Sequence, residues 1–308
     1  MARYVLSGAT SFLGRHLARG LLEAGHAVYA IVRPGSANRH VLPAHPGCHV
    51  ILADVAQTET WRRAIGRADL FLHLAWDGAG MEGRAKQEVQ AENIRQSLAC
   101  LRAAAQLGAR RFVFFGSQAE YGPQTQPVDE TAPCAPVTEY GKAKLEFGRQ
   151  AADLARELGI GYTHLRVFSV YGPGDHPWTL VNTCLEGFLS GQEVALSSCE
   201  QPWNFLYISD LVRAVLALCD SPEDRGCGVF NIAGDQTRPL REYVDAIWRL
   251  CGSRGAPRYG ARGDRLEWPY GIMPDNEKLH RTTAWTQQVS FEMGIRTMLD
   301  QAAGEGTR

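Results

Sequence analysis

The chain has 308 residues, enough for one large domain or two smaller ones, and its charge is nearly balanced, with 32 Lys+Arg against 33 Asp+Glu. That balance argues against a nucleic-acid-binding platform, and no apolar run is long enough for a membrane span or a signal peptide. The eight cysteines are scattered without a C-x-x-C pair, which predicts reduced thiols, no metal site and a cytoplasmic protein.

The first half of the chain alternates short apolar runs with helical patterns. Strands are predicted at residues 3–7, 27–32, 49–53, 70–74, 111–116 and 162–168. Helices are predicted at residues 12–24, 81–107 and 140–158. The strands are apolar on both faces and the helices are long enough to be crossovers. The pattern therefore predicts an α/β fold with a doubly wound, Rossmann-type parallel sheet.

After residue 168 this alternation breaks down. A loop at 173–177 is followed by predicted elements at residues 179–190, 194–197, 209–219, 228–233, 241–250 and 292–302. The helix at 209–219 and the strand at 228–233 resemble late members of the main sheet. We therefore expect a Rossmann-type domain formed by residues 1–168 and 205–236. Residues 169–204 and 237–308 would form a smaller, discontinuous domain at the carboxyl ends of the strands, where open α/β sheets bind ligands.

A glycine turn directly follows the first predicted strand, where residues 7–14 read S-G-A-T-S-F-L-G. Gly8 permits a tight turn, Gly14 allows close helix packing, and the free N–H groups of the following helix suit a pyrophosphate. The alternative is an ordinary βα turn, but the strand–turn–helix context favours a dinucleotide site. The predicted contacts in this turn are Gly8, Thr10, Ser11, Phe12, Leu13 and Gly14.

The residues after the second predicted strand indicate which dinucleotide is bound. NAD sites place a carboxylate there for the ribose 2′-OH, but this chain has no carboxylate between Glu23 and Asp54. Arg33 instead offers a planar cation for a 2′-phosphate, with Ser36 nearby. We therefore predict NADP(H), with NAD(H) as the second possibility. The alternative is that Arg33 is a solvated surface arginine.

A tyrosine, a lysine and a serine form a candidate catalytic set. Tyr140 and Lys144 are four residues apart on a predicted helix, so they share one face. A nearby ammonium favours the phenolate and moves the tyrosine pKa from ~10 toward neutral pH. Ser117 follows the fifth predicted strand, in the segment G-S-Q-A-E-Y-G, where its hydroxyl could bond the reacting oxygen. The alternative, a core tyrosine and a solvated lysine, is disfavoured by this context.

These motifs together make nearly the whole chain, to about Trp285, resemble the extended short-chain dehydrogenase/reductase family of sugar-nucleotide epimerases, dehydratases and reductases. One departure is Ser11, which replaces the middle glycine of the family's turn. The resemblance implies that Lys144 also holds the nicotinamide ribose. It implies further cofactor contacts at Asp54, Val55, Leu74, Ala75, Trp76, Asn93, Tyr140 and Phe168. It implies substrate contacts at Asp77, Ser117, Gln118, Tyr140, Ser169, Asn182, Trp203 and Arg262.

The residues after Ser117 narrow the reaction. The family's 4,6-dehydratases carry Thr-Asp-Glu here, whereas this chain has Ser117, Gln118 and Ala119, none of them an acid or a base. We expect Glu120 to point to the opposite side of an extended segment. Gln118 also stands where the family's epimerase-reductases have a cysteine. Two reactions remain, NADPH-dependent reduction of the 4-keto group of a nucleotide-linked 6-deoxysugar and C4 epimerisation with retained cofactor, and the predicted NADP preference favours reduction.

The late part of the chain resembles the nucleotide end of the family's site. Arg262, in the segment R-G-D, matches the arginine that clamps the sugar-nucleotide pyrophosphate, although Arg258 and Arg265 are equally able neighbours. Ser169 replaces the family's usual asparagine. Trp203 replaces a second arginine, and it could stack on the base or the sugar or belong to the core.

Two further functions stay open, reduction of a non-sugar ketone and a non-catalytic NADP-sensing role. Arg262 argues against the first, because such ketones carry no pyrophosphate. The set of Ser117, Tyr140 and Lys144 argues against the second. We expect a nucleotide-sugar substrate, no nucleic-acid or membrane partner, and a homodimer.

Overall fold

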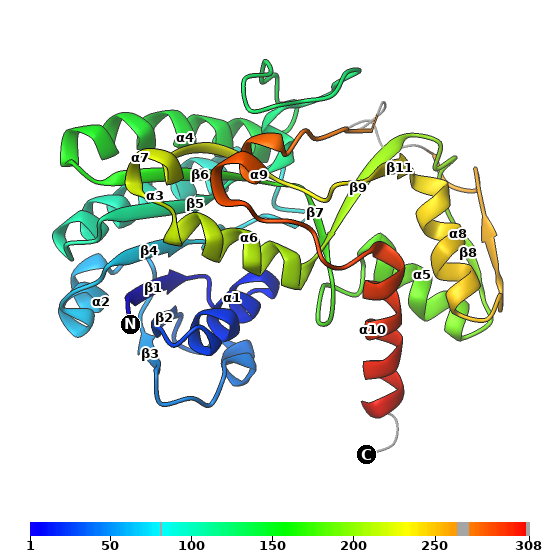
Figure 1. The fold of residues 1–308 in the computed structure, drawn as a ribbon, viewed down its shortest axis with the longest axis horizontal. Coiled ribbons are helices and arrows are strands. Elements are labelled where there is room, and N and C mark those ends of the chain that lie inside the picture. Colours follow the sequence, from blue (N-terminus) through cyan, green and yellow to red (C-terminus); the bar gives the residue numbers. More distant parts are fainter. Residues whose placement is uncertain (81, 264–270, 306–308) are drawn as a thin grey trace.

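A seven-stranded parallel sheet forms the centre of the computed structural model, which describes residues 1–80, 82–263 and 271–305. Its strands are β1 (Arg3–Ser7), β2 (Ala27–Val32), β3 (Cys48–Leu52), β4 (Leu70–His73), β5 (Arg111–Phe115), β6 (Gly161–Val167) and β10 (Gly228–Ile232). Their order is β10-β6-β5-β4-β1-β2-β3 (Figure 1). The winding reverses at β1, so a ligand crevice is expected between the carboxyl ends of β1 and β4.

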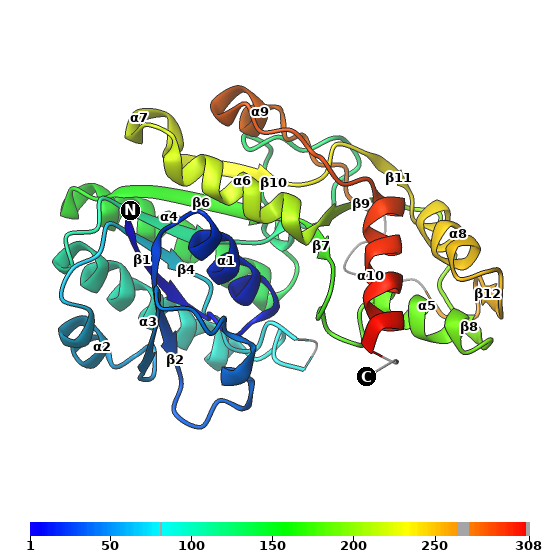
Figure 2. The same ribbon diagram turned by 60° about the horizontal axis from the view of Figure 1, so that its bottom comes forward.

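Helices cover both faces of this sheet (Figure 2). One face carries α1 (Phe12–Glu23) and α6 (Ile208–Asp220), and the other carries α2 (Thr58–Ile65), α3 (Gln87–Gln106) and α4 (Glu139–Leu158). Successive strand residues alternate between the faces. In β1, Tyr4 and Leu6 accordingly pack with α1 and α6, whereas Val5 packs on the other side. Strands that are apolar on both faces thus produce the predicted doubly wound fold.

The second half of the chain adds a smaller lobe, on the right of Figure 1. It contains a three-stranded sheet, a two-stranded sheet and three helices. The strands are β7 (Ser169–Tyr171), β9 (Pro202–Tyr207) and β11 (Thr237–Pro239), and then β8 (Glu193–Ala195) and β12 (Ala256–Arg258). The helices are α5 (Leu180–Leu189), α8 (Leu240–Leu250) and α10 (Phe291–Glu305). Short helices elsewhere are η1 (Ala37–Val41), η2 (Gln118–Glu120), α7 (Glu223–Gly226) and α9 (Glu277–Thr283).

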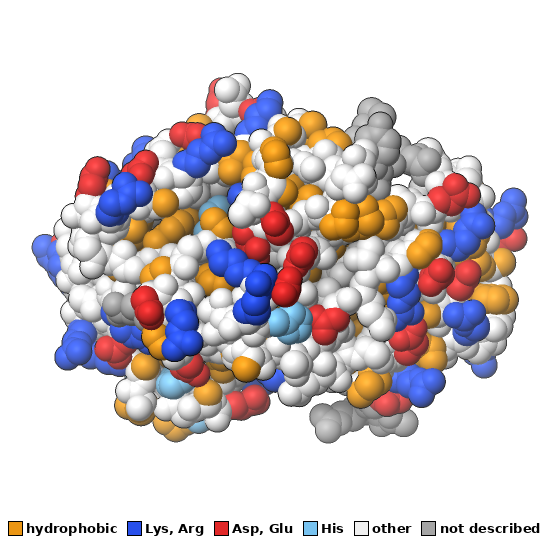
Figure 3. Space-filling model, turned by 45° about the horizontal axis from the view of Figure 1, so that its top comes forward, with side chains coloured by type: hydrophobic (Ala, Val, Ile, Leu, Met, Phe, Trp, Pro, Cys, Tyr) orange, Lys and Arg blue, Asp and Glu red, His pale blue; other side chains and the backbone are white. Residues whose placement is uncertain are grey.

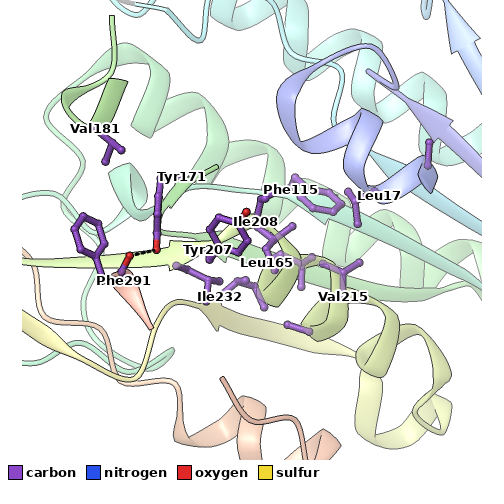
Figure 4. Close-up of a cluster of buried hydrophobic side chains, with 14 of the residues drawn as sticks. Leu17, Phe115, Leu165, Tyr171, Val181, Tyr207, Ile208, Val215, Ile232 and Phe291 are labelled. Carbon is purple, nitrogen blue, oxygen red and sulfur yellow. Dashed lines mark hydrogen bonds between the residues drawn. The ribbon is translucent and has the colours of Figure 1, made fainter. Parts of the chain in front are cut away.

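One hydrophobic core runs through both lobes (Figure 4). Leu17 and Val215, from the two helices on the sheet, belong to the same buried cluster as Val181 and Phe291 of the smaller lobe. The Tyr171 hydroxyl donates a hydrogen bond to the Phe291 carbonyl at 3.1 Å. Late in the chain, α9 returns to pack against α6 and β10. The division into two domains therefore remains a proposal about binding roles, because the two parts share one core.

Several elements differ from the sequence-based predictions. The helix predicted to begin at residue 81 begins at Gln87, because Gly78 takes a φ of +68° and the backbone of Gly83 packs directly on it. The helix α2 was not predicted. Only Trp61 and Ile65 of α2 are buried, too few to produce a visible helical period. The strands β7, β9, β11 and β12 were also missed, and three of them have only three residues.

The surface carries charges of both signs. On the face in Figure 3, acidic and basic side chains lie side by side with apolar patches between them. Within residues 1–80, 82–263 and 271–305, no helix is both long enough and apolar enough to cross a bilayer.

Candidate active site

The turn after β1 is built for a close backbone approach. Gly8 has a φ of +69°, and a Cβ on it would lie 2.8 Å from the Ala75 nitrogen, so a side chain here would push apart the ends of β1 and β4. A Cβ on Gly14 would overlap the Gly8 carbonyl oxygen. Ser11 is the N-cap of α1, and its Oγ accepts the Gly14 N–H at 3.1 Å. The substitution of the family's middle glycine by Ser11 therefore supplies a helix cap.

A cleft of about 310 Å³ lies at the carboxyl ends of β1 and β4. Most of the predicted cofactor contacts line it. They are Gly8, Thr10, Ser11, Arg33, Ser36, Asp54, Val55, Leu74, Ala75, Trp76 and Asn93. Phe12 and Leu13 instead pack against the main core, and Phe168 lies in a separate buried cluster with Tyr140. Asn38, Gln96 and Ser97 also line the cleft, and no sequence motif indicated them.

His73, at the end of β4, braces the cleft. Its Nδ1 lies 2.8 Å from Ser7 Oγ, and its Nε2 lies 2.8 Å from Ser97 Oγ. Burial, with a smaller contribution from the Lys144 charge, lowers the pKa of His73 to about 3. The ring is therefore neutral, and it ties β1, β4 and α3 together.

Asn93 and Arg33 both meet Asp77. The Asn93 side-chain oxygen accepts the Asp77 N–H at 2.9 Å, and its amide group donates to the Asp77 carbonyl at 2.8 Å. This pair of bonds fixes the loop after β4. The Asp77 carboxylate then lies 3.2 Å from Arg33 Nη1, and both side chains are more than 60% exposed. Asp77, predicted as a substrate contact, thus lines the same cleft as Arg33.

Ser117 begins a tight turn, and the prediction of an extended segment here is wrong. Ser117 is the N-cap of η2, and its Oγ accepts the Ala119 N–H at 3.2 Å. The Glu120 carboxylate folds back to accept the Ser117 N–H at 2.8 Å, which closes a reciprocal cap. Glu120 therefore points into the core and is fully buried.

Lys144 and Tyr140 lie on α4, which packs against η2. The Lys144 ammonium donates to the Phe115 carbonyl at 2.7 Å and lies 5.7 Å from the centre of the Tyr140 ring. It also lies 4.0 Å from the centre of the Trp76 ring. Burial lowers the pKa of Lys144 to about 7, and the Glu120 charge partly opposes this effect. Lys144 therefore changes its charge near neutral pH.

Arg84 is a neighbour of Tyr140 that sequence reasoning missed. Its guanidinium carbon lies 4.4 Å from the centre of the Tyr140 ring, and its carbonyl accepts the Tyr140 N–H at 3.0 Å. The loop between β4 and α3 thus contacts the start of α4. No local motif indicates such a contact, because it joins segments more than 50 residues apart.

Two predicted substrate contacts lie near this group. The Gln118 Oε1 atom is buried, and it has no hydrogen-bond partner among the residues that the structure describes. Trp203 on β9 packs against the cluster that contains Tyr140 and Phe168. Gln118 thus lies on η2, which packs against the helix of the candidate tyrosine, and Trp203 lies against its cluster.

The remaining predicted substrate contacts lie in the smaller lobe. Ser169 begins β7 and pairs with β9. Asn182 donates to the carbonyls of Asp175 and His176, both at 3.0 Å, and lines a second cavity between α5 and α10. Arg262 is exposed, and its N–H donates to the Leu196 carbonyl at 2.9 Å.

The arginines near Arg262 differ in whether an ion pair already occupies them. Arg258 forms an ion pair with Glu193 at 2.9 Å. Asp264 and Arg265 lie outside the described residues. Three arginines were considered for the pyrophosphate, and the structure describes two of them. Of these two, Arg258 has an ion pair, whereas none is recorded for Arg262.

Comparisons with known proteins show what the chain as a whole is similar to. The model of the NAD dependent epimerase/dehydratase family matches residues 4–233. The chain is 28% identical, over 83% of its own length and 93% of the relative's, to a dTDP-6-deoxy-L-talose 4-dehydrogenase (NAD(+)) of Aggregatibacter actinomycetemcomitans. It is 23% identical to a UDP-glucose 4-epimerase of Azospirillum brasilense, over 99% and 96% of the two chains.

Solved structures extend the likeness to the whole fold. The structure of MoeE5 in complex with UDP-glucuronic acid and NAD superposes with a TM-score of 0.83 at 25% identity, and the match covers 99% of this chain and 100% of MoeE5. The structure of UDP-glucose 4-epimerase from Thermotoga maritima, determined with UDP-glucose, gives a TM-score of 0.85 at 23% identity over 98% and 99% of the chains.

Proposed function

This chain belongs to the NAD dependent epimerase/dehydratase family, and we propose that it reduces the 4-keto group of a nucleotide-linked 6-deoxysugar. The observation that carries the proposal is that the turn of Ser117 packs against the helix of Tyr140 and Lys144. The two residues after Ser117 are Gln118 and Ala119, neither of which is an acid or a cysteine. The relative named as a dTDP-6-deoxy-L-talose 4-dehydrogenase supports it. That reaction, run in reverse, is the reduction of a 4-keto group.

We assign the cleft to NADP(H). The bare backbone of Gly8 and the capped start of α1 leave room and free N–H groups for a pyrophosphate. Arg33 and Ser36 line the cleft where the 2′-phosphate would lie, and no carboxylate directly follows β2. NAD(H) is the second possibility, because the relatives named above are described with NAD. When bound, the nicotinamide supplies the hydride that is transferred to C4.

The chain's own groups then handle the proton. Tyr140 gives its phenolic proton to the carbonyl oxygen as the alcohol forms, and Ser117 Oγ donates a hydrogen bond that orients this oxygen. The Lys144 ammonium stabilises the phenolate that remains, because an adjacent positive charge favours the ionised form. A proton from solvent restores Tyr140. One hydride and one proton thus convert the ketone into the alcohol, and no further acid or base is needed.

The substrate end is assigned from three features. The unpaired Gln118 Oε1 can accept a hydrogen bond from a sugar hydroxyl. Trp203 offers an aromatic face beside the Tyr140 cluster. Arg262 can form two parallel hydrogen bonds to the pyrophosphate. In this proposal, residues 1–168 and 205–236 hold the cofactor, and residues 169–204 and 237–308 hold the nucleotide sugar.

The experiment is a screen of nucleotide-linked 4-keto-6-deoxysugars with NADPH. We expect NADPH oxidation in a one-to-one ratio with the C4 alcohol formed. NADH should support slower turnover. A screen in which no 4-keto sugar is reduced would contradict the proposal.

A 4-epimerase is the second candidate, because relatives with that name match almost the full chain. Epimerases retain their cofactor, whereas reductases must exchange it after each turnover. If the protein is a reductase, it should therefore carry little bound cofactor after purification. If a 4-hydroxy nucleotide sugar, incubated without added cofactor, reaches an equilibrium with its C4 epimer, the epimerase is correct.

A further inference from the structure

A buried carboxylate that the proposed reaction does not use lies directly behind Ser117. Glu120 is fully buried. Its Oε1 lies 3.0 Å from His164 Nε2, and its Oε2 accepts a hydrogen bond from Arg166 Nε at 3.1 Å. Burial raises the pKa of Glu120, but His164, Arg166 and the Ser117 N–H together hold it below its usual range. The carboxylate is therefore charged at neutral pH.

Glu120 and Lys144 hold the two ends of one short segment. The Lys144 ammonium donates to the carbonyl of Phe115, and the Glu120 carboxylate accepts the N–H of Ser117. Only Gly116 lies between these two anchor points. Two buried charges of opposite sign thus fix the backbone on each side of Gly116 and, with it, the direction of the serine side chain.

Glycines make this arrangement possible. A Cβ on Gly116 would overlap both the Glu120 carboxylate and the His164 ring. On α4, a Cβ on Gly148 would overlap the same ring, and a Cβ on Gly141 would overlap the Ala119 carbonyl of η2. The Glu120 carboxylate, the turn of Ser117 and the helix of Tyr140 therefore pack so closely that no side chain fits at these glycines. Such close packing transmits a shift of one part to the others.

We propose that Glu120 is a positioning residue for the reaction: it anchors the Ser117 turn and supplies the buried negative charge that favours the ammonium form of Lys144. This inference rests on the proposed function. The physical reason is that a lysine in an apolar site loses its proton unless an opposite charge lies nearby. A protonated Lys144 is in turn what stabilises the Tyr140 phenolate.

The surroundings of Lys144 make Glu120 the relevant charge. Glu120 from η2, His73 from β4 and Tyr140 on the same helix interact with the ammonium. His164 and Arg166 of β6 contact Glu120, and Arg84 contacts Tyr140, so Glu120 is the negative charge in this group. His73 is neutral. The ring centres of Trp76 and Phe114 lie 4.0 and 4.6 Å from the ammonium. Aromatic rings attract a cation, but they carry no net charge that could replace Glu120.

The test measures the protonation of Lys144 directly. The chain contains only four lysines, Lys86, Lys142, Lys144 and Lys278, so NMR of protein labelled with ¹³Cε-lysine can follow each one. In Glu120→Gln, which keeps an acceptor for the Ser117 N–H, we expect Lys144 to titrate roughly one pH unit lower than in the wild type. In Glu120→Asp, which keeps the charge, the titration should return toward the wild-type midpoint.

Two further variants keep the test decisive. Asp210→Asn is the matched control, because Asp210 is also fully buried, pairs with Arg213 and accepts two backbone N–H groups, but lies on α6. It should lower stability without moving the Lys144 titration. If Glu120→Gln fails to fold, Arg166→Gln serves instead. Removing that cation should raise the pH at which Lys144 titrates.

Kinetics then test the positioning role. With the substrate found in the screen, Glu120→Gln should lower kcat about tenfold, with KM changed less than about threefold, and should shift the pH profile of kcat. An unchanged Lys144 titration in a folded Glu120→Gln protein would overturn the inference. The NMR measurement needs no substrate. A failed screen would therefore contradict the proposed function alone, and a failed titration would contradict the role of Glu120 alone.

Discussion

Tyr140 is the residue whose single oxygen atom is expected to carry the reacting proton. Replacing it with phenylalanine keeps the ring that packs with Ala119 and Phe168. Tyr140→Phe should therefore bind NADPH about as well as the wild type, while kcat falls about 10²- to 10⁴-fold. Fluorescence titration of NADPH and steady-state kinetics measure the two effects. A variant with near wild-type kcat would remove Tyr140 from the mechanism.

The ion pair of Arg33 with Asp77 makes a prediction about cofactor choice. Arg33→Ala should weaken NADPH binding about tenfold or more and leave NADH binding almost unchanged, because only NADPH carries the 2′-phosphate. Asp77→Asn releases Arg33 from its partner and removes a nearby negative charge. It should therefore tighten NADPH binding by about two- to fivefold. Calorimetric titration of each variant with both cofactors measures this, and equal losses for both cofactors in Arg33→Ala would refute the assignment.

Lys144 links the site to stability. Its pKa is lowered to about 7 in the folded protein, so above that pH the unfolded chain binds a proton that the folded chain has released. The free energy of unfolding of the wild type should therefore rise as the pH increases from about 7 toward the ordinary lysine value. Lys144→Met lacks this group. Its stability relative to the wild type should be highest below pH 7 and should decline by pH 9, as measured by urea unfolding.

Sequence reasoning anticipated the close-packed turn after β1 because its motif is local. Gly8 and Gly14 are required by backbone geometry within one turn, and the structure shows the two close approaches. Contacts between distant segments could not be read in the same way. Arg33 meets Asp77 across 44 positions, and Glu120 meets Arg166 across 46. Only the strand order brings those pairs together.

At the scale of elements, the packing of α4 on η2 and β6 depends on glycine. Alanine usually stabilises a helix by up to about 1 kcal/mol relative to glycine. In Gly148→Ala, however, the new methyl group would overlap the His164 ring, which is held by Glu120. We expect a loss of about 1–3 kcal/mol from overpacking. Arg149→Ala, at the exposed neighbouring position, should change stability by less than about 0.5 kcal/mol. Thermal unfolding compares the two, and a Gly148→Ala protein as stable as the wild type would refute the tight packing.

Long elements were predicted well because their periodicity is visible over several turns or over a whole strand. The helix α4 begins at Glu139, one residue before the predicted start, and ends where expected at Leu158. The start of α3 was wrong because two glycines in the preceding loop pack on each other, which no period reveals. The prediction of an extended segment at η2 was wrong because the turn is capped by Glu120, which folds back to Ser117. A strand-like sequence gave no sign of that contact.

For the whole molecule, the shared core predicts cooperative unfolding. Residues of α1, α5, α6 and α10 belong to one buried cluster, so neither lobe can lose its structure without exposing the other's apolar surface. Calorimetry should show a single transition. Saturating NADPH should move that transition as a unit to higher temperature, because it binds only the folded chain. Two separated transitions, with only one of them moved by NADPH, would show that the lobes are independent.

The same core has a consequence for biosynthesis. Tyr4 and Leu6 of the first strand are buried in one cluster with Leu211 and Val215 of α6, which comes in the last third of the chain. A ribosome adds about 5–20 residues per second, so part of the apolar face of β1 stays uncovered until α6 has been translated. The nascent polypeptide therefore carries exposed hydrophobic surface for most of its synthesis. Messages truncated before the codons for α6 should yield aggregates rather than a smaller folded protein.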